Sequence, residues 1–129
     1  MTWDPADAAA FRAAVSATLA EFVDDQGARL APLGPDAERL VLAAREAVAG
    51  GKRFRASFCW WGYRAVAYDV ADEHALLRAA ASLELLHASA LVHDDYMDAS
   101  DTRRGRPATH RAFEAEYRAA GWRGDPEQY

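Results

Sequence analysis

Residues 73–98 read EHALLRAAASLELLHASALVHDDYMD, and they carry the clearest helical pattern in the chain. Apolar residues recur along this stretch three or four positions apart, which is the spacing of one face of an α-helix. Asp72 directly precedes the stretch and is a suitable N-cap. The segment therefore predicts a long helix. The face that we expect it to present consists of Leu76, Leu77, Ala80, Leu83, His87, Leu91 and Asp94.

Four other segments predict helices on both sides of this one. The first begins in WDPADAAAF, with Asp4 as the cap and Pro5 at the first helical position, and we expect it to end before Gly27. The second runs from GPDAERLV to AVAGG, the third lies within residues 53–68, and the last within residues 108–122. No segment alternates as a strand would. The sequence thus predicts an all-α fold with about five helices.

The overall composition limits the class of protein. The chain has 129 residues, which suits one domain or part of one, and a formal charge of −5 argues against a general nucleic-acid binder. Cys59 is the single cysteine, so no internal disulfide can form. The first residues lack the pattern of a signal peptide. No apolar run looks long enough to cross a bilayer. We therefore expect a cytoplasmic protein without a transmembrane segment.

Three aspartates stand at the end of the long helix. If that helix continues through Asp98, Asp94 and Asp98 are one turn apart on the same face and Asp95 lies beside them. Like charges at this spacing and carboxylates at a helix C-terminus are both unfavourable unless a cation is present. Carboxylate oxygens suit Mg²⁺, which also takes waters and phosphate oxygens. The alternative is a solvated helix end that pairs loosely with the arginines that follow.

Two groups of basic residues accompany the aspartates. Arg103 and Arg104 follow in DTRRGRPATH, where Gly105 allows a sharp turn, and arginine matches phosphate oxygens. Lys52 and Arg55 lie upstream in GGKRFR, where a helix start would put them on one face near free backbone amides. The alternative for that segment is a glycine stop followed by a solvated basic turn.

His87 precedes Asp94 by two helical turns and is predicted on the same face. It either packs in the core or donates to an anion in a cleft. One arrangement explains all of these residues. A Mg²⁺ site on the aspartates holds one polyphosphate, Lys52, Arg55, Arg104 and His87 hold a second anion, and apolar helix faces form a pocket between them. The substrate is then apolar with a diphosphate head.

The segments GGKRFR and ELLHASALVHDDYMDASDTRRGRPATH together resemble the trans-isoprenyl diphosphate synthases, or polyprenyl synthetases. The resemblance implies a homodimeric helical bundle of the isoprenoid synthase type that joins isopentenyl diphosphate to an allylic diphosphate through an allylic carbocation. It implies that Asp94, Asp95 and Asp98 are catalytic residues that bind Mg²⁺ and the allylic diphosphate, which Arg103 also contacts. The residues implied to bind isopentenyl diphosphate are Lys52, Arg55, His87 and Arg104.

The chain departs from that family at two points. Ala56 stands where the family has proline, and no second aspartate-rich motif is present. We therefore expect residues 1–129 to be the N-terminal part of a single synthase domain, inactive alone, with exposed apolar helix faces that favour self-association. The alternative is a non-catalytic or truncated subunit whose partner carries the second motif. A terpene cyclase is less favoured, because it has no use for a second basic diphosphate site.

Overall fold

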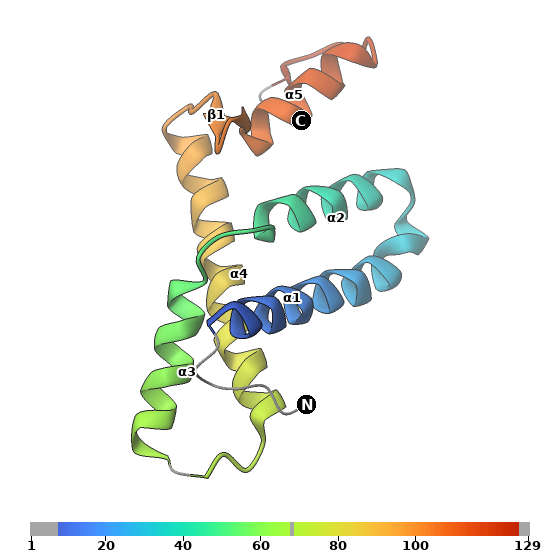
Figure 1. Cartoon of the computed structure of the whole chain (residues 1–129). Coiled ribbons are helices and arrows are strands. Elements are labelled where there is room, and N and C mark those ends of the chain that lie inside the picture. Colours follow the sequence, from blue (N-terminus) through green and yellow to red (C-terminus); the bar gives the residue numbers. More distant parts are fainter. Residues whose placement is uncertain (1–7, 68, 127–129) are drawn as a thin grey trace. The chain divides into compact units, whose positions relative to one another are not determined.

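The computed structural model describes residues 8–67 and 69–126, so the expected cap at Asp4 and Pro5 lies outside the described residues. The chain divides into two compact units, residues 1–87 and residues 88–129. The described residues form helices with one very short hairpin, which confirms the prediction of an all-α fold with five helices (Figure 1). The expectation of a single domain stays a prediction.

The first unit contains α1 (Ala8–Leu30), the short η1 turn (Ala31–Leu33), α2 (Pro35–Val48), α3 (Phe54–Val66) and the first part of α4 (Glu73–Met97). Helices α1 and α2 lie side by side and are joined through η1 (Figure 1). Every fourth residue of α1 from Phe11 to Val23 is buried, and the Phe11 ring lies 5.6 Å from the ring of Trp60 on α3. The core of this unit consists of Phe11, Ala14, Val15, Leu19, Val23, Ala37, Val48, Ala56, Trp60, Leu76, Ala80 and Ala81.

Gly27 does not end the first helix, and the prediction that it would is wrong. Helix α1 continues to Leu30, and Gly27 lies where α1 approaches α2. A Cβ atom at Gly27 would come within 3.1 Å of Cγ1 of Val41. The glycine therefore lets two helices pack closely, which is a tertiary reason that the local pattern does not contain.

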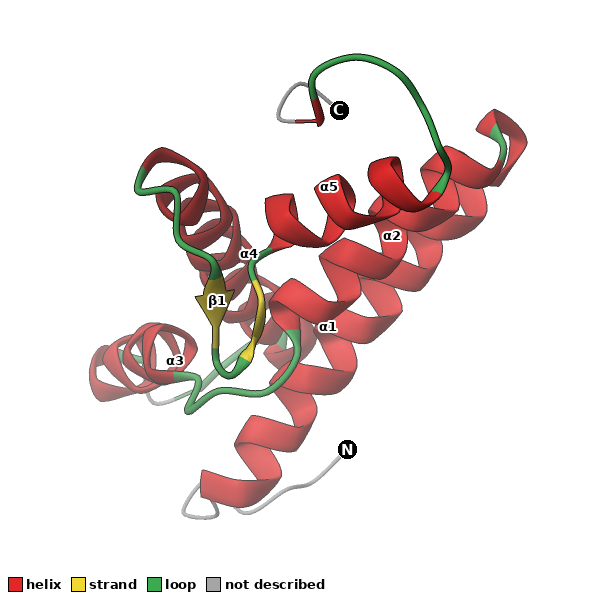
Figure 2. Ribbon diagram, turned by 90° about the horizontal axis from the view of Figure 1, so that it is seen from above, coloured by secondary structure: helices red, strands yellow, loops and turns green. Residues whose placement is uncertain are grey.

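The second unit contains the end of α4, the strands β1 (Thr102–Arg103) and β2 (Arg106–Pro107), and α5 (Thr109–Ala119). The strands pair antiparallel, with Arg103 opposite Arg106 (Figure 2). Two residues per strand are too few to produce an alternating pattern, so the sequence did not predict this hairpin.

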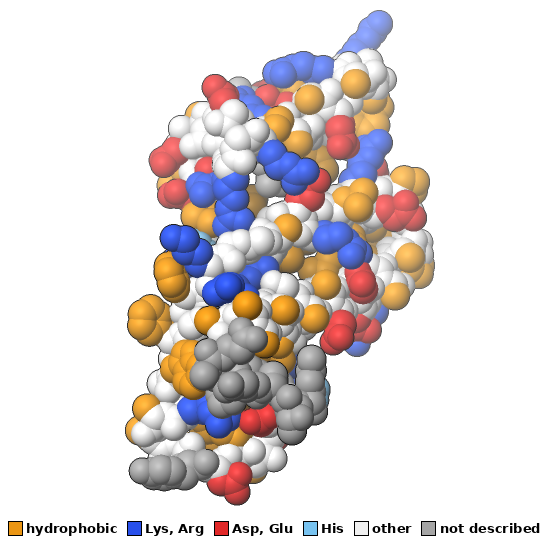
Figure 3. Space-filling model, viewed as in Figure 1, with side chains coloured by type: hydrophobic (Ala, Val, Ile, Leu, Met, Phe, Trp, Pro, Cys, Tyr) orange, Lys and Arg blue, Asp and Glu red, His pale blue; other side chains and the backbone are white. Residues whose placement is uncertain are grey.

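Helix α4 corrects the expectation that no apolar run could cross a bilayer. It is long and apolar enough by length and composition alone, with a mean hydropathy of 1.4 over its best window of 18 residues. Core helices of bundles meet the same criterion, and α4 bears the buried carboxylate of Glu84 in its middle. Only 28% of the 18-residue window is buried inside the structure, which is less than a core helix usually shows. Figure 3 shows hydrophobic side chains at the surface of the molecule, between charged ones.

Candidate functional site

The end of α4 is closed by a Schellman motif in the middle of the acidic segment. The Ser100 amide donates to the Asp95 carbonyl at 2.9 Å, and the Ala99 amide donates to the Tyr96 carbonyl at 3.3 Å. Ala99 has a φ of +51°, the left-handed conformation that glycine usually supplies at this position. The three aspartates therefore lie in the last turn of α4 and its closing residues.

The structure gives the three aspartates different environments. Asp94 and Asp98 are exposed, and the Asp98 amide donates to the Asp94 carbonyl at 2.9 Å, so they occupy successive turns. Asp95 is only 4% exposed, and both of its carboxylate oxygens accept hydrogen bonds from Arg103. Among the residues that the structure describes, no group of three or more His, Cys, Asp or Glu side chains is placed to hold a metal ion together.

The Asp95–Arg103 pair is a bidentate ion pair between α4 and β1. Nε of Arg103 donates to Oδ2 of Asp95, and Nη2 donates to Oδ1 at 2.6 Å. The hydrogen bonds from Arg103, with a smaller contribution from the nearby His110, hold the pKa of Asp95 below its usual value near 3.8. The same pairing raises the pKa of Arg103. Nη1 of Arg103 takes no part in either bond, so one edge of the guanidinium stays outside the pair.

The two-residue turn of the hairpin presents Arg104. Arg104 has a φ of +53° and Gly105 a φ of +76°, the combination that a type I′ turn requires. The expectation that Gly105 permits a sharp turn is confirmed. Arg104 is exposed at this turn and adopts a conformation that a non-glycine residue rarely takes.

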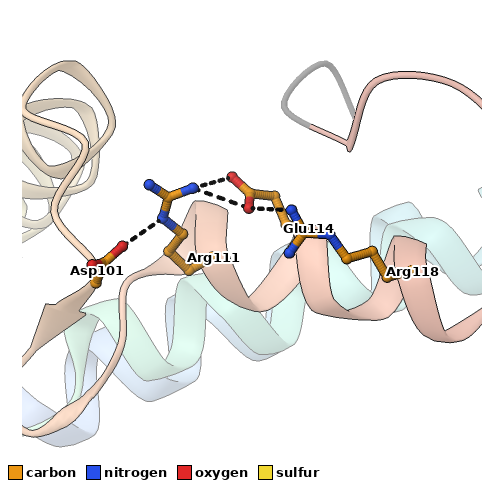
Figure 4. A network of polar contacts seen from close by, with 4 residues as sticks. All are labelled: Asp101, Arg111, Glu114 and Arg118. Carbon is orange, nitrogen blue, oxygen red and sulfur yellow. Dashed lines mark hydrogen bonds and ion pairs between the residues drawn. The ribbon is translucent and has the colours of Figure 1, made fainter.

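A polar network ties the hairpin to α5 (Figure 4). Asp101 accepts a 3.0 Å hydrogen bond from Nε of Arg111 through its side chain, and its carbonyl accepts the Ala108 amide at 3.0 Å. Nη1 of Arg111 donates to both oxygens of Glu114, which is buried, and Arg118 reaches the same carboxylate at 3.4 Å. The ends of the segment that carries Arg103 and Arg104 are thereby joined.

The basic segment of the first unit differs from its prediction. Gly50 and Gly51 have positive φ values, Arg53 is also left-handed with a φ of +56°, and α3 begins only at Phe54. Lys52 therefore lies outside the helix, and the expectation that it shares a helical face with Arg55 is wrong. Both Lys52 and Arg55 are exposed. Nζ of Lys52 lies 5.7 Å from the centre of the Phe54 ring.

Arg53, between these two cations, is buried in a polar cluster that sequence reasoning missed. Its Nη2 donates to the Val48 carbonyl at 2.8 Å and to Oγ of Ser16 at 3.2 Å. Its Nη1 lies 3.8 Å from Oε2 of Glu84, and Oε1 of Glu84 accepts the Ala56 amide at 3.2 Å. One of the amides expected to attract an anion at the start of α3 is thus already bonded. A lone glutamate within the apolar run of α4 was the available signal.

The eight residues predicted for the site fall in both units. Lys52, Arg55 and the half-buried His87 belong to the first unit, and the other five belong to the second. Within the second unit the structure brings Asp95 and Arg103 into contact. The substrate-binding roles of all eight residues stay predictions.

A solved structure gives the class of protein. The crystal structure of geranylgeranyl pyrophosphate synthase from Corynebacterium glutamicum, complexed with isoprenyl diphosphate and magnesium, matches 92% of this chain with a TM-score of 0.83 and 41% identity. The match covers 34% of that protein. The chain therefore has an all-α fold of the isoprenoid synthase type.

The family model of polyprenyl synthetase matches residues 37–120, which is more than half of the chain. The chain belongs to the polyprenyl synthetase family, and the resemblance seen in the sequence is confirmed.

Two curated relatives show how much of a family member the chain spans. It is 42% identical over 79 residues to geranylgeranyl pyrophosphate synthase 12, chloroplastic, of Arabidopsis thaliana, covering 56% of this chain and 21% of that protein. It is 43% identical over 74 residues to geranylgeranyl diphosphate synthase of Methanosarcina mazei, covering 57% and 22%. Each alignment thus spans about a fifth of the relative.

Proposed function

We propose that this chain carries two diphosphate-binding sites of a trans-isoprenyl diphosphate synthase that acts head-to-tail with Mg²⁺. Lys52, Arg55, His87 and Arg104 bind isopentenyl diphosphate, and Asp94, Asp95, Asp98 and Arg103 serve the allylic diphosphate. The observation that carries the proposal is the acidic end of α4, where two exposed carboxylates one turn apart stand beside the Asp95–Arg103 pair.

The residues at the end of α4 fit a magnesium ion. Mg²⁺ is commonly held by one or two carboxylates together with waters and substrate phosphates, so it needs no cluster of three. Asp94 and Asp98 are exposed and can supply such oxygens. The carboxylate of Asp95 is engaged by Arg103, and its role as a third ligand stays a prediction. The C. glutamicum relative was crystallised with magnesium, which supports this choice of metal.

In the proposed reaction, the carbon–oxygen bond of the allylic diphosphate breaks, and the electron pair leaves with the diphosphate. The double bond of isopentenyl diphosphate then attacks the allylic cation, and a proton is lost. Mg²⁺ would supply neutralisation of the leaving diphosphate. Arg103 can donate to the diphosphate through Nη1, which lies outside its pair with Asp95. Asp95 holds the guanidinium plane in place for that contact.

The aspartate site is tested by binding of inorganic diphosphate with and without Mg²⁺, measured by calorimetry. For the wild-type chain, Mg²⁺ is expected to strengthen binding by about tenfold. The double variant Asp94→Asn/Asp98→Asn should lose that gain, because amide oxygens carry no charge to hold the cation. The matched control is Glu21→Gln/Asp25→Asn, which neutralises two exposed carboxylates one turn apart on α1. An equal Mg²⁺ effect in all three proteins would contradict the proposed site.

The alternative is a non-catalytic or truncated subunit that needs a partner with a second aspartate-rich motif. One relative, 42% identical over 76 residues, is named heptaprenyl diphosphate synthase component 2 from Geobacillus stearothermophilus. That name supports the alternative, because it describes one component of a synthase. Chain elongation is measured with radiolabelled isopentenyl diphosphate, geranyl diphosphate and Mg²⁺. Turnover by this chain alone would exclude the alternative. Turnover that appears only with an added partner would support it.

Self-association and a cytoplasmic location belong to the same proposal. Large apolar side chains are exposed on the helices of the first unit, among them Phe58 at 79% and Val66 at 83% on α3. Faces of this kind favour a second copy or another chain as cover. Light scattering of the purified chain should give a mass of at least twice 14.1 kDa. A monomeric mass at micromolar concentration would contradict self-association.

A further inference from the structure

The basic side chains at the start of α3 point in different directions: two are exposed to solvent and the one between them is buried. Lys52 and Arg55 are exposed, whereas Arg53 between them is only 5% exposed and Ala56 is fully buried. Arg53 reaches inward from a left-handed backbone, a conformation that is unfavourable for a residue other than glycine. Such a conformation persists only where surrounding contacts hold it.

Those contacts come from three other helices of the same unit. The guanidinium of Arg53 bonds the carbonyl of Val48 at the end of α2 and the hydroxyl of Ser16 on α1. Glu84 on α4 pairs with Arg53 and also accepts the Ala56 amide in the first turn of α3. The backbone between Lys52 and Arg55 is thus fixed from both sides, through the Arg53 side chain and through the Ala56 amide.

A buried ion pair is a costly way to gain stability alone, because well-packed apolar residues often serve as well or better. Here the pair fixes the backbone that carries two exposed cations. We propose that Arg53 and Glu84 are positioning residues, which hold Lys52 and Arg55 in the geometry that binds the diphosphate of isopentenyl diphosphate. This inference rests on the proposed function of the basic segment.

The test is binding of inorganic diphosphate to the 129-residue chain in EDTA, measured by calorimetry at low salt, so that binding through Mg²⁺ does not contribute. The decisive variant is Arg53→Met/Glu84→Gln, which removes both charges together and keeps an acceptor for the Ala56 amide. Its matched control is Arg64→Met/Glu73→Gln, which removes the exposed 3.0 Å pair at the other end of α3. The reference variant is Lys52→Ala/Arg55→Ala, and circular dichroism establishes that each protein is folded.

The wild-type chain and the control should bind with affinities within about twofold of each other. The reference variant should lose about tenfold or more. The Arg53→Met/Glu84→Gln variant should lose about tenfold while keeping its helix content, since supporting residues typically matter to that extent. A stability role alone would change the unfolding midpoint and leave the affinity unchanged.

Two results would overturn the inference directly, and a second variant covers the case in which the first does not fold. If the Arg53→Met/Glu84→Gln variant binds like the wild type while the reference variant does not, positioning is wrong and the basic site stands. If the reference variant binds like the wild type, the basic site itself is wrong and the inference falls with it. If the Arg53→Met/Glu84→Gln variant does not fold, Glu84→Asp replaces it, and an unchanged affinity there counts against positioning. A loss of about threefold is expected for that shorter carboxylate.

Discussion

The two arginine–carboxylate pairs at the candidate site differ in how they are built. Arg53 and Glu84 are both buried, at 5% and 8% side-chain exposure, and Glu84 lies 28 residues beyond the amide that it also binds. Arg103 and Asp95 are only eight residues apart, and the arginine remains 35% exposed. The first pair is tertiary and excluded from solvent, whereas the second joins a helix end to the adjacent hairpin.

This difference separates two roles that a charged pair can have: it can support the backbone that carries other charges, or it can contact a ligand itself. The pair of the first unit lies beneath the exposed cations Lys52 and Arg55, so we infer that it acts through the backbone. The pair of the second unit lies at the surface itself, and the free edge of Arg103 can meet a ligand. Removal of a charge should therefore affect folding most in the first unit and ligand binding more directly in the second.

The largest effect is expected for Glu84→Ala. Loss of this carboxylate leaves the buried charge of Arg53 uncompensated and the Ala56 amide without its acceptor, which should cost about 3–5 kcal/mol. The measurement is chemical denaturation followed by circular dichroism. Glu73→Ala, which removes the exposed partner of Arg64, serves as the control and should cost less than about 1 kcal/mol. Equal costs for the two variants would remove the distinction between buried and exposed pairs.

A smaller loss is expected for Asp95→Asn. The carboxylate charge and one of the two acceptors of Arg103 are lost, but one amide oxygen remains and the guanidinium can turn to solvent, so we expect a loss of about 1–2 kcal/mol. Asp98→Asn at the exposed position should leave the unfolding free energy unchanged or slightly raised, because a carboxylate at a helix C-terminus is unfavourable. A loss at Asp95 as large as that at Glu84 would show that both pairs behave as buried.

A substitution in the closing turn of α4 is expected to stabilise the chain, in contrast to the two losses above. Ala99→Gly removes the left-handed strain at the Schellman position and should raise the unfolding free energy by about 0.5–1 kcal/mol. The same exchange at the exposed Ala90 within α4 should lower it by about 1 kcal/mol, because glycine disfavours a helix interior. Thermal unfolding measures both. Destabilisation by Ala99→Gly would mean that this position gains nothing from glycine.

The smallest expected effect is a dependence of the unfolding free energy on pH through Asp95. The pKa of Asp95 is below 3.8 in the folded chain because of Arg103, and it is close to about 3.9 when the chain is unfolded. Near pH 4 the unfolded state therefore binds more protons at this residue, so its stabilisation is present above that pH and is lost as the pH falls through the folded value. Denaturation at pH 6 and pH 3 should show a larger drop for the wild type than for Asp95→Asn. Equal drops would contradict the pairing.

Local chemistry made much of the fold predictable. Asp72 was expected to cap the long helix, and its carboxylate accepts the Ala75 amide at 2.9 Å. The turn at Gly105 and the acidic end of α4 were also read from adjacent residues. Capping, turns and helix periodicity depend on neighbours within a few positions, so the sequence displays them directly.

Contacts between distant segments could not be read in the same way. Gly27 looked like a helix stop because nothing local reveals Val41 beside it. Arg53 looked like one more cation in GGKRFR, although its partner lies on α4. The left-handed backbone at Arg53 is what moves Lys52 out of the helix and sends the middle cation inward. The sequence therefore supplied the chemistry of the site and missed the residues that we propose to support it.

The separation along the chain of the bonded groups also bears on the order in which the chain folds. Closing a loop costs entropy that grows by about 0.6 kcal/mol for each doubling of its length, so the 28 residues between Ala56 and Glu84 cost about 1 kcal/mol more than the eight between Asp95 and Arg103. The end of α4 can join its hairpin while the rest of the chain is still unfolded. The first turn of α3 gains its acceptor only after α4 has docked. We therefore expect that, during synthesis, the basic segment is made before α4 but reaches its final backbone conformation only after Glu84 has been added.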